Sequence, residues 1–275
     1  MPELPEVESI RQSLIPLIQG KEISALEVLH PDVFENPFNY NLRAAKIERL
    51  SRSGKYLQIH LSNGCFLLIH LRMTGKLLYH EELEEIKAHT HLRFTLKDAD
   101  GKNSYLDYND VRRFGRVGLY RDKSEVILPG FRALGPDALA ADFSSDYLYA
   151  QAKRYPKRPI KALLLDQTIV AGLGNIYCDE ALFRAGIHPK RASGRISKAR
   201  IEALFAEIKP LLLESIGLKG TSFSDYVDGL GKKGSFIEKL KVYGKKGEPC
   251  PNCGRPLLAE QIAGRTTVFC PRCQR

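Results

Sequence analysis

The sequence lacks any apolar run long enough to cross a bilayer, so nothing in it predicts a membrane-spanning helix. Its first eight residues also lack lysine and arginine and include three glutamates, whereas secretory signals and transit peptides are basic near their start. We therefore expect a cytoplasmic protein, in a compartment where disulfides are rare. No internal repeat is present, and a hydrophobic content of 43% excludes a wholly disordered chain.

A deficit of acidic residues distinguishes the second half of the chain from the first. The 275 residues suffice for one large domain or two ordinary ones, with a core that needs no disulfides. Residues 1–150 hold 19 basic and 21 acidic side chains, a net charge of −2, but residues 151–275 hold 23 and 11, a net charge of +12. A half this basic indicates a polyanionic partner. The alternative is a lysine-rich surface that only keeps the protein soluble.

The first half predicts one helix followed by strands. Residues 5–20 place apolar side chains on one helical face and end at Gly20, although Pro16 predicts a kink or a shorter helix. Residues 21–130 have the alternation and turns typical of a β-sandwich or barrel. Strands are expected at 56–61, 65–71, 92–96, 105–108 and 117–121.

The second half predicts helices and then loops. A linker rich in glycine, proline and alanine at 131–142 precedes a helical stretch over 143–216. Ser197 is expected to cap a helix with a continuous apolar stripe. Residues 217–249 are rich in glycine, lysine and serine and predict a loop.

Four cysteines form the strongest local motif. Cys250 and Cys253 are separated by 16 residues from a second pair, Cys270 and Cys273. Two such pairs supply four thiolates in a tetrahedron, which is the ligand set of a closed structural zinc site. Two disulfides or a redox pair are the alternatives, and the expected compartment and the matched spacing argue against them.

A glycine motif precedes Asn175. Gly172 and Gly174 stand between helical stretches, where they allow a phosphate to approach the backbone closely. Asn175 would add a side-chain amide donor. The alternative is an ordinary packing corner between two helices.

The N-terminus offers a possible nucleophile. Because the second residue is small, Met1 should be removed, and the chain would then start with the secondary amine of Pro2. An α-amino group has a reference pKa of ~7.7–8.0, so a useful fraction is unprotonated at neutral pH. Such an amine can attack an electrophilic carbon and form an iminium, with Glu3 as an adjacent acid. The alternative is an ordinary proline-containing start.

Lys55 stands out by its position in a strand pattern. It shares one face with Leu57 and Ile59, which are apolar. A lysine on that face indicates a charge held near an internal cleft. The alternative is a side chain that extends to solvent at the strand edge.

Segments along the whole chain together resemble one known family. They are 2–8 (PELPEVE), 54–57 (GKYL), 70–75 (HLRMTG), 111–115 (VRRFG), 134–136 (LGP), 172–177 (GLGNIY), 242–250 (VYGKKGEPC) and 264–265 (GR). This ordered set resembles the DNA glycosylase family that includes formamidopyrimidine-DNA glycosylase and endonuclease VIII. Leu4 and Val7 resemble the purine-specific branch, because the endonuclease VIII branch typically has glycine after the first glutamate.

The resemblance implies four catalytic residues. Pro2 would attack C1′ of the damaged nucleotide, and Glu3 would donate a proton that helps to open the deoxyribose ring. Lys55 matches a lysine that holds DNA phosphate and serves β-elimination. Arg265 matches a zinc-ribbon arginine that grips phosphate and assists δ-elimination.

The resemblance also implies residues that contact DNA. Met73, Arg112 and Phe114 match a trio inserted into the duplex where the lesion has left, which agrees with the way that apolar wedges fill such gaps. Without the resemblance, Met73 and Phe114 would be assigned to the core. The remaining expected DNA contacts are His89, Lys157 and Asn175, of which Lys157 competes with its neighbours Arg154 and Arg158 for one role.

The implied architecture is an α+β multidomain fold. A catalytic β-sandwich domain with a leading helix is expected at 1–130, and a linker at 131–142. A helix-two-turn-helix domain with a lesion-binding loop is expected at 143–235, and a zinc ribbon at 236–275.

The implied function is that of a monomeric DNA repair enzyme with one structural Zn²⁺, no organic cofactor and no membrane partner. It would excise 8-oxoguanine and formamidopyrimidines from double-stranded DNA through a Schiff base and cleave the abasic site by β,δ-elimination. Two alternatives stay open: an oxidised-pyrimidine glycosylase of the endonuclease VIII type, and a zinc-ribbon DNA-binding protein without catalysis. The chain departs from many members at Val111, where they have proline.

Overall fold

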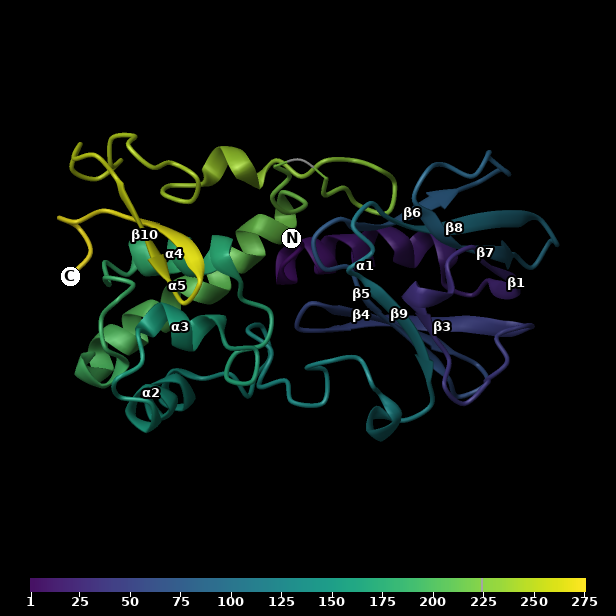
Figure 1. Cartoon of the computed structure of the whole chain (residues 1–275), viewed down its shortest axis with the longest axis horizontal. Coiled ribbons are helices and arrows are strands. Elements are labelled where there is room, and N and C mark those ends of the chain that lie inside the picture. Colours follow the sequence, from purple (N-terminus) through teal and green to yellow (C-terminus); the bar gives the residue numbers. More distant parts are fainter. Residues whose placement is uncertain (224) are drawn as a thin grey trace. The chain divides into compact units, whose positions relative to one another are not determined.

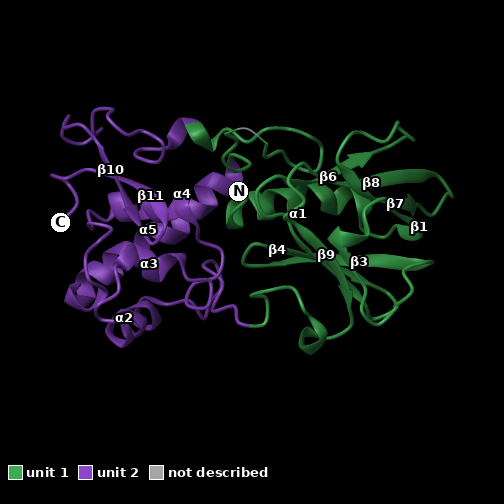
Figure 2. Cartoon of the chain, in the orientation of Figure 1, with its two compact units in different colours: residues 1–132, 218–237 green, residues 133–217, 238–275 purple. Residues whose placement is uncertain are grey.

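The structure is a computed structural model, which describes residues 1–223 and 225–275. These residues form two compact units, which Figure 2 colours separately. Unit 1 comprises residues 1–132 and 218–237, and unit 2 comprises residues 133–217 and 238–275. Within the described ranges, no helix is both long and apolar enough to cross a membrane.

Helix α1 (Leu4–Ile18) forms because its apolar residues recur at helical spacing. Val7, Ile10 and Leu14 are buried on one face and pack into the core of unit 1. Pro16 lies in the last turn, where it removes one hydrogen bond without ending the helix. A left-handed Gly20 (φ 87°) follows the helix end, so the predicted helix is confirmed with slightly different ends.

The strands of unit 1 form a nine-stranded sheet in the order β2-β9-β5-β4-β3-β1-β7-β8-β6. Figure 1 draws the strands as arrows. Among the strand pairs that the structure describes in this sheet, β2 and β9 run parallel and the others run antiparallel. The strands are β1 (Glu22–Val28), β2 (Phe34–Glu35), β3 (Ala45–Ser53), β4 (Tyr56–Leu61), β5 (Phe66–His70), β6 (Gly75–His80), β7 (Thr90–Lys97), β8 (Asn103–Asp110) and β9 (Arg116–Tyr120), with 3₁₀ turns at Pro31–Val33 and Lys123–Glu125.

The sheet divides at β1 into two layers. This strand pairs with β3 only at Glu22 and Ile23, next to a bulge, but pairs with β7 along its whole length. The two layers enclose one apolar core together with α1, which confirms the predicted sandwich and leading helix. Each of the five predicted strands overlaps an observed one, and 56–61 coincides with β4.

Unit 2 contains four described α-helices and a two-stranded ribbon. Helix α5 buries Ile201, Leu204 and Ile208 on the predicted stripe and ends at Gly217. The elements are α2 (Ser145–Arg154), α3 (Ile160–Leu165), α4 (Asn175–Arg184), α5 (Lys198–Gly217), β10 (Leu258–Ile262) and β11 (Arg265–Phe269), with a 3₁₀ turn at Ser193–Arg195. A further 3₁₀ turn, Phe236–Lys239, begins in the last residues of unit 1 and ends in unit 2.

Residues 218–237 belong to unit 1, although the expected domain boundaries group most of them with the helices. The Tyr226 ring lies in the core of unit 1, and the Thr221 amide donates to Glu6 Oε1 at 2.8 Å. These contacts explain why residues 218–237 pack with unit 1 and not with the helices. A hydrogen bond between residues 215 positions apart leaves no local pattern in the sequence.

Candidate functional site

The N-terminus of α1 brings together two of the predicted catalytic residues. Glu3 is the N-cap residue, and the carboxylates of Glu3 and Glu6 form a reciprocal capping box with backbone amides. Glu6 Oε2 accepts from the Glu3 amide at 2.8 Å. Pro2 is buried directly before this turn, and Glu3 is 3% exposed. The fold therefore buries the acid that follows Pro2 in the chain, at a helix end that favours anionic groups.

The turn before Lys55 is attached to the same helix. Arg52 donates to Glu8 Oε2 at 3.2 Å and to the Gly54 carbonyl oxygen at 2.8 Å. Arg11 also pairs with Glu8, at 2.6 Å. Burial raises the pKa of the Glu8 carboxyl, but the hydrogen bonds and charge of Arg11 outweigh burial and hold this pKa below its usual range. The backbone that leads to Lys55 is thus held by α1.

Lys55 itself lies inside unit 1. Lys55 is only 7% exposed. This burial agrees with a charged side chain held inside the unit and not with one that extends to solvent. Burial, together with the charges of Arg72 and Lys55, lowers the pKa of His70 to about 3. His70 is therefore neutral at physiological pH, so the cationic charge beside it comes from Lys55 and Arg72.

Met73, Arg112 and Phe114 lie on two neighbouring turns organised by Asp110. Thr74 Oγ1 donates to Asp110 Oδ1 at 2.5 Å and accepts from the Arg112 amide at 3.1 Å. The Arg112 guanidinium lies 3.3 Å from the Met73 sulfur. Met73 is 43% exposed and Phe114 is 57% exposed. The assignment of these two apolar side chains to the core is therefore wrong.

His89 is exposed on the segment between β6 and β7. Its backbone is left-handed (φ 66°), and its carbonyl oxygen accepts from the Asp110 amide at 3.0 Å. The structure therefore connects His89 to the same strand end that organises Arg112.

Asn175 and Arg265 are brought together in unit 2. Asn175 begins α4, and its side-chain amide donates to the Thr266 carbonyl oxygen at 2.9 Å. Ala263 and Gly264 both have positive φ, as a two-residue hairpin requires, and this turn leaves Arg265 exposed at the start of β11. Asn175 therefore joins α4 to the ribbon beside Arg265, a role that the sequence did not indicate.

A buried ion pair supports this arrangement. Lys161 Nζ lies 2.5 Å from Asp179 Oδ1, and both side chains are fully buried. The ammonium also donates to Thr267 Oγ1 at 2.7 Å, and the Val268 amide donates to Asp179 Oδ2 at 3.0 Å. Burial raises the pKa of Asp179 to about 7, although Lys161 acts in the opposite direction. The pair joins α3 and α4 to β11.

Lys157 is exposed in the turn before α3, and Arg154 is exposed at the last residue of α2. Of the three basic residues that compete for one DNA contact, Arg158 is engaged with Asp166 at 2.8 Å. The Arg154 guanidinium lies over the Tyr155 ring, 5.4 Å from its centroid. The role of Lys157 stays a prediction.

The four cysteines form one compact cluster. Their sulfur atoms lie within 4.8 Å of one another, with Cys250–Cys273 at 3.9 Å and Cys253–Cys270 at 3.5 Å. Four thiolates at about 2.3 Å from one zinc ion are about 3.8 Å apart, so the cluster fits Zn²⁺. Although burial opposes them, hydrogen bonds from the Cys273 and Arg272 amides lower the pKa of Cys270 to about 7, whereas burial raises the pKa of Cys250 and of Cys273.

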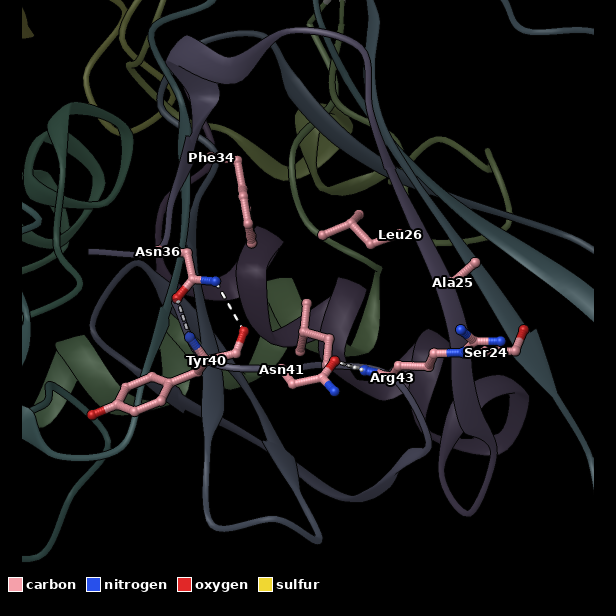
Figure 3. Close-up of a pocket in the computed structure, with 9 residues that line it drawn as sticks. Ser24, Ala25, Leu26, Phe34, Asn36, Tyr40, Asn41 and Arg43 are labelled. Carbon is pink, nitrogen blue, oxygen red and sulfur yellow. Dashed lines mark hydrogen bonds between the residues drawn. The ribbon is translucent and has the colours of Figure 1, made fainter. Parts of the chain in front are cut away.

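A surface pocket of about 500 Å³ lies elsewhere in unit 1, and no predicted site residue lines it. It opens where β1 diverges from β3, between Leu26 and Phe34 (Figure 3). Asn36 closes one wall by donating to and accepting from the Tyr40 backbone, each at 2.9 Å. The pocket therefore belongs to the framework and not to the candidate site.

Sequence reasoning missed the residues that hold the site in place. Glu6, Asp110, Lys161 and Asp179 are all buried. Glu6 and Asp110 accept from the amides of the predicted site residues Glu3 and Arg112, and Lys161 and Asp179 bond to β11, which begins at Arg265. The available signal was weak: a charged side chain at a position where the neighbouring pattern is apolar.

Profiles of three known domains match the chain. The formamidopyrimidine-DNA glycosylase N-terminal domain matches residues 1–117, and its H2TH domain matches residues 134–227. The zinc finger found in FPG and IleRS matches residues 247–275. Together the three profiles account for the sandwich, the helical part and the cysteine cluster.

Full-length relatives and solved structures agree with these matches. Formamidopyrimidine-DNA glycosylases of Heliobacterium modesticaldum and Desulfitobacterium hafniense are 48% and 44% identical, and each comparison covers 100% of both chains. A mutant FPG of Lactococcus lactis, solved with Fapy-dG-containing DNA, is 36% identical over 100% of both chains with a TM-score of 0.89. The MutM (FPG) protein of Thermus thermophilus is 37% identical, with a TM-score of 0.88 over 99% of this chain and 98% of that one. The chain therefore belongs to the formamidopyrimidine-DNA glycosylase family.

Proposed function

We propose that this protein excises oxidised purines, such as 8-oxoguanine and formamidopyrimidines, from double-stranded DNA and then cleaves the abasic site by β,δ-elimination. One observation carries the proposal: Pro2 and Glu3 lie at the capped start of α1 in a chain whose full-length relatives are formamidopyrimidine-DNA glycosylases. The Lactococcus lactis protein solved with Fapy-dG-containing DNA supports the substrate class.

Pro2 acts as the nucleophile once Met1 has been removed. Its nitrogen attacks C1′ of the damaged nucleotide, and the bond from C1′ to the base breaks as the new bond forms. The base leaves with the proton that the amine loses. Glu3 donates a proton to the deoxyribose ring oxygen, the ring opens, and an iminium remains between Pro2 and the sugar.

The iminium then promotes strand cleavage. It acidifies the C2′ proton, whose loss expels the 3′ phosphate, and a second elimination expels the 5′ phosphate. Lys55 and Arg265 neutralise phosphate charge during these steps. Water hydrolyses the remaining adduct and returns the Pro2 amine.

The remaining site residues hold the DNA. Met73, Arg112 and Phe114 fill the gap that the extruded nucleotide leaves, because they are exposed together on neighbouring turns. The basic second half of the chain supplies most of the phosphate contacts. The proposed phosphate contacts are Lys55, Asn175 and Arg265, and the further proposed DNA contacts are His89 and Lys157.

One Zn²⁺, bound by the four cysteines, has a structural role. It closes the two knuckles of the ribbon, whose β10–β11 turn presents Arg265. We propose the bacterial cytosol, where the genomic DNA lies, as the place of action.

The first test is borohydride trapping on a duplex with 8-oxoguanine opposite cytosine. A covalent protein–DNA adduct is expected, and intact mass should show a protein without Met1. A form that retains Met1 should not be trapped, because its Pro2 nitrogen is an amide. Full lyase activity of the Met1-retaining form would exclude Pro2.

Glu3→Gln separates acid catalysis from binding. Glutamine has nearly the same shape and adds no negative charge, so DNA binding should persist, but its amide cannot donate a proton as an acid does. Base excision should be abolished. Wild-type excision by this variant would remove Glu3 from the mechanism.

Arg265→Ala tests the phosphate grip of the ribbon. The slope of log K against log[salt] for an abasic-analogue duplex should shrink by about one unit, since one phosphate contact is lost. More product should also stop after β-elimination. Arg255→Ala, a truncation at another exposed arginine of the ribbon, is the matched control. If Arg265→Ala has the salt slope and product ratio of the wild type, Arg265 neither binds phosphate nor assists δ-elimination.

A second candidate substrate class is oxidised pyrimidines. A structure of the Lactococcus lactis protein, 37% identical, contains oxidised-pyrimidine DNA. Parallel assays on an 8-oxoguanine duplex and a thymine glycol duplex decide between the classes, and we expect faster excision of 8-oxoguanine.

A further inference from the structure

We infer that Glu6 is a positioning residue that couples the return segment, defined as residues 218–223 and 225–237, to the N-terminal nucleophile. The inference rests on the proposed function, because it assumes that Pro2 and Glu3 act on a nucleotide. It adds a residue that acts through the positions of Glu3 and Thr221.

The Glu6 carboxylate joins two backbone amides that are distant in the chain. Oε2 accepts from the Glu3 amide and Oε1 accepts from the Thr221 amide, both at 2.8 Å. Glu6 is only 1% exposed, so both are hydrogen bonds to a buried charged group, which are stronger than ordinary ones. A single side chain thus fixes the residue next to the nucleophile and the start of the return segment.

A second contact holds the same junction. The Tyr226 hydroxyl lies 3.2 Å from the Glu6 carbonyl oxygen and 3.0 Å from that of Lys219, positioned to donate to both. Gly220 is left-handed (φ +80°), and a Cβ there would lie 2.9 Å from Glu6 Oε1. The return segment therefore packs so closely on Glu6 that only glycine fits beside the carboxylate.

The return segment presents an aromatic side chain near this junction. Phe223 stands two residues after Thr221 and is 51% exposed. The start of the return segment is bonded to the first turn of α1 through Glu6. The same carboxylate therefore sets the position of the return segment and that of Pro2. A nucleotide that still carries its nucleobase needs the return segment and Pro2 to be correctly placed relative to each other. An abasic site has no nucleobase, so it needs only Pro2 in place.

Glu6→Gln should break one of the two links selectively. The single amide oxygen of glutamine can serve one backbone amide, and its NH₂ group faces the other as a second donor. Glutamine still forms a capping box, so the local bond to Glu3 survives and the bond to Thr221 is lost. The variant should keep its nucleophile in place while the return segment loses its attachment.

The experiment compares two single-turnover reactions of the full-length protein. Base excision from an 8-oxoguanine duplex should fall about tenfold in Glu6→Gln, the effect of one lost charge-assisted hydrogen bond. Lyase activity and borohydride trapping on a preformed abasic duplex should stay close to wild type. Glu48→Gln, the same change at an exposed site in unit 1, should leave both reactions unchanged.

Tyr226→Phe provides an independent variant that leaves the carboxylate intact. It removes the hydroxyl bonds to the Glu6 and Lys219 carbonyl oxygens and the contact of the hydroxyl with the Ser9 side chain. Excision should therefore fall by about threefold to tenfold, and abasic-site cleavage should again be spared. Both variants keep the size of the side chain they replace, so the core around the junction stays filled.

The outcomes separate the inference from the proposed function. Wild-type protein that neither excises 8-oxoguanine nor is trapped on abasic DNA contradicts the proposed function. An active wild type with equal losses of both reactions in Glu6→Gln and in Tyr226→Phe, or with no loss in either variant, overturns the coupling.

Discussion

The two units hold their working residues by different means. In unit 1, the buried carboxylates of Glu6 and Asp110 accept hydrogen bonds from backbone amides. These bonds fix Glu3 and the turn that bears Arg112. In unit 2, the ribbon that bears Arg265 is closed by four cysteines and bonded to the helices through the Lys161–Asp179 pair.

The sandwich and the ribbon are stabilised differently because the apolar core of the sandwich is much larger than the buried cluster of the ribbon. The sandwich and α1 share an extensive apolar core, so the carboxylates there need only orient loops on an already stable framework. The buried cluster of the ribbon is small and includes two of the cysteines themselves. A module of that size gains its folding free energy from a metal.

Removing one zinc ligand should have the largest effect and should divide the units most clearly. Cys253→Ser should unfold the ribbon, because zinc binding contributes about 10–16 kcal/mol in comparable modules. Hydrogen exchange should accelerate over β10 and β11 but not over the sandwich, and DNA affinity should fall.

Cys253→His is the matched control, since histidine can also bind zinc in place of one thiolate. It should retain metal and most of the DNA affinity. The absence of zinc from the wild type in metal analysis, with DNA binding unaffected by chelators, would contradict the structural role of the metal.

Breaking the buried ion pair should have the next largest effect. Lys161→Met leaves Asp179 buried without its cation, which should lower the free energy of unfolding by about 3–5 kcal/mol. Hydrogen exchange near Thr267 should report the loosened ribbon. The double variant Lys161→Met/Asp179→Leu should recover most of the stability, and failure to recover would show that the charges themselves are required.

Asp110→Ala tests the corresponding device of unit 1. It removes the acceptor of the Thr74 hydroxyl and of the Gly115 amide, and one of the two acceptors of the Arg112 amide, which should cost about 2–3 kcal/mol of stability. Binding to an abasic-analogue duplex should weaken, because the turns that bear Met73 and Arg112 lose their common support. Asp100→Ala, at an exposed site, is the control, and equal binding by the two variants would contradict the role of Asp110.

Glu8→Gln should give the smallest effect, and a pH-dependent one. The folded-state pKa of Glu8 is lowered, so its ion pair stabilises the protein above the unfolded-state pKa and this stability is lost as pH falls through the folded-state value. The difference in unfolding free energy between wild type and variant should be about 1 kcal/mol at pH 7, since the pair is partly exposed, and should shrink towards pH 3. Denaturant titrations across this range measure it, and a constant difference would exclude the ion pair as its source.

Much of the architecture could be predicted because it depends on local patterns. The apolar spacing that predicts α1 and α5 and the alternation that predicts β4 are properties of neighbouring residues. The cysteine spacing similarly predicts the cluster observed at one point in unit 2. The family resemblance, confirmed by full-length relatives, supplied the glycosylase function that those patterns alone left open.

Other features could not be predicted from local patterns alone, because the same side chain could be buried in the core or exposed on the surface. Met73 and Phe114 have the apolar character of core residues, yet both are exposed on turns. Asn175 was expected to bind phosphate, and its amide also bonds to the ribbon. Side-chain type does not reveal which face of a turn is solvent-exposed, so burial had to come from the fold.

The sequence by itself determined the family, the four cysteines that fit a zinc ion, and the succession of a leading helix, a β-sandwich, a helical part and a cysteine ribbon. Only the tertiary structure decided that residues 218–237 pack with the N-terminal unit, and that Glu6, Asp110 and Lys161 support the site. The physical reason is the range of the interactions. Periodicity and motif spacing are set between neighbours, whereas a buried charge is stable only beside a partner that folding brings from 36, 106 or 215 residues away.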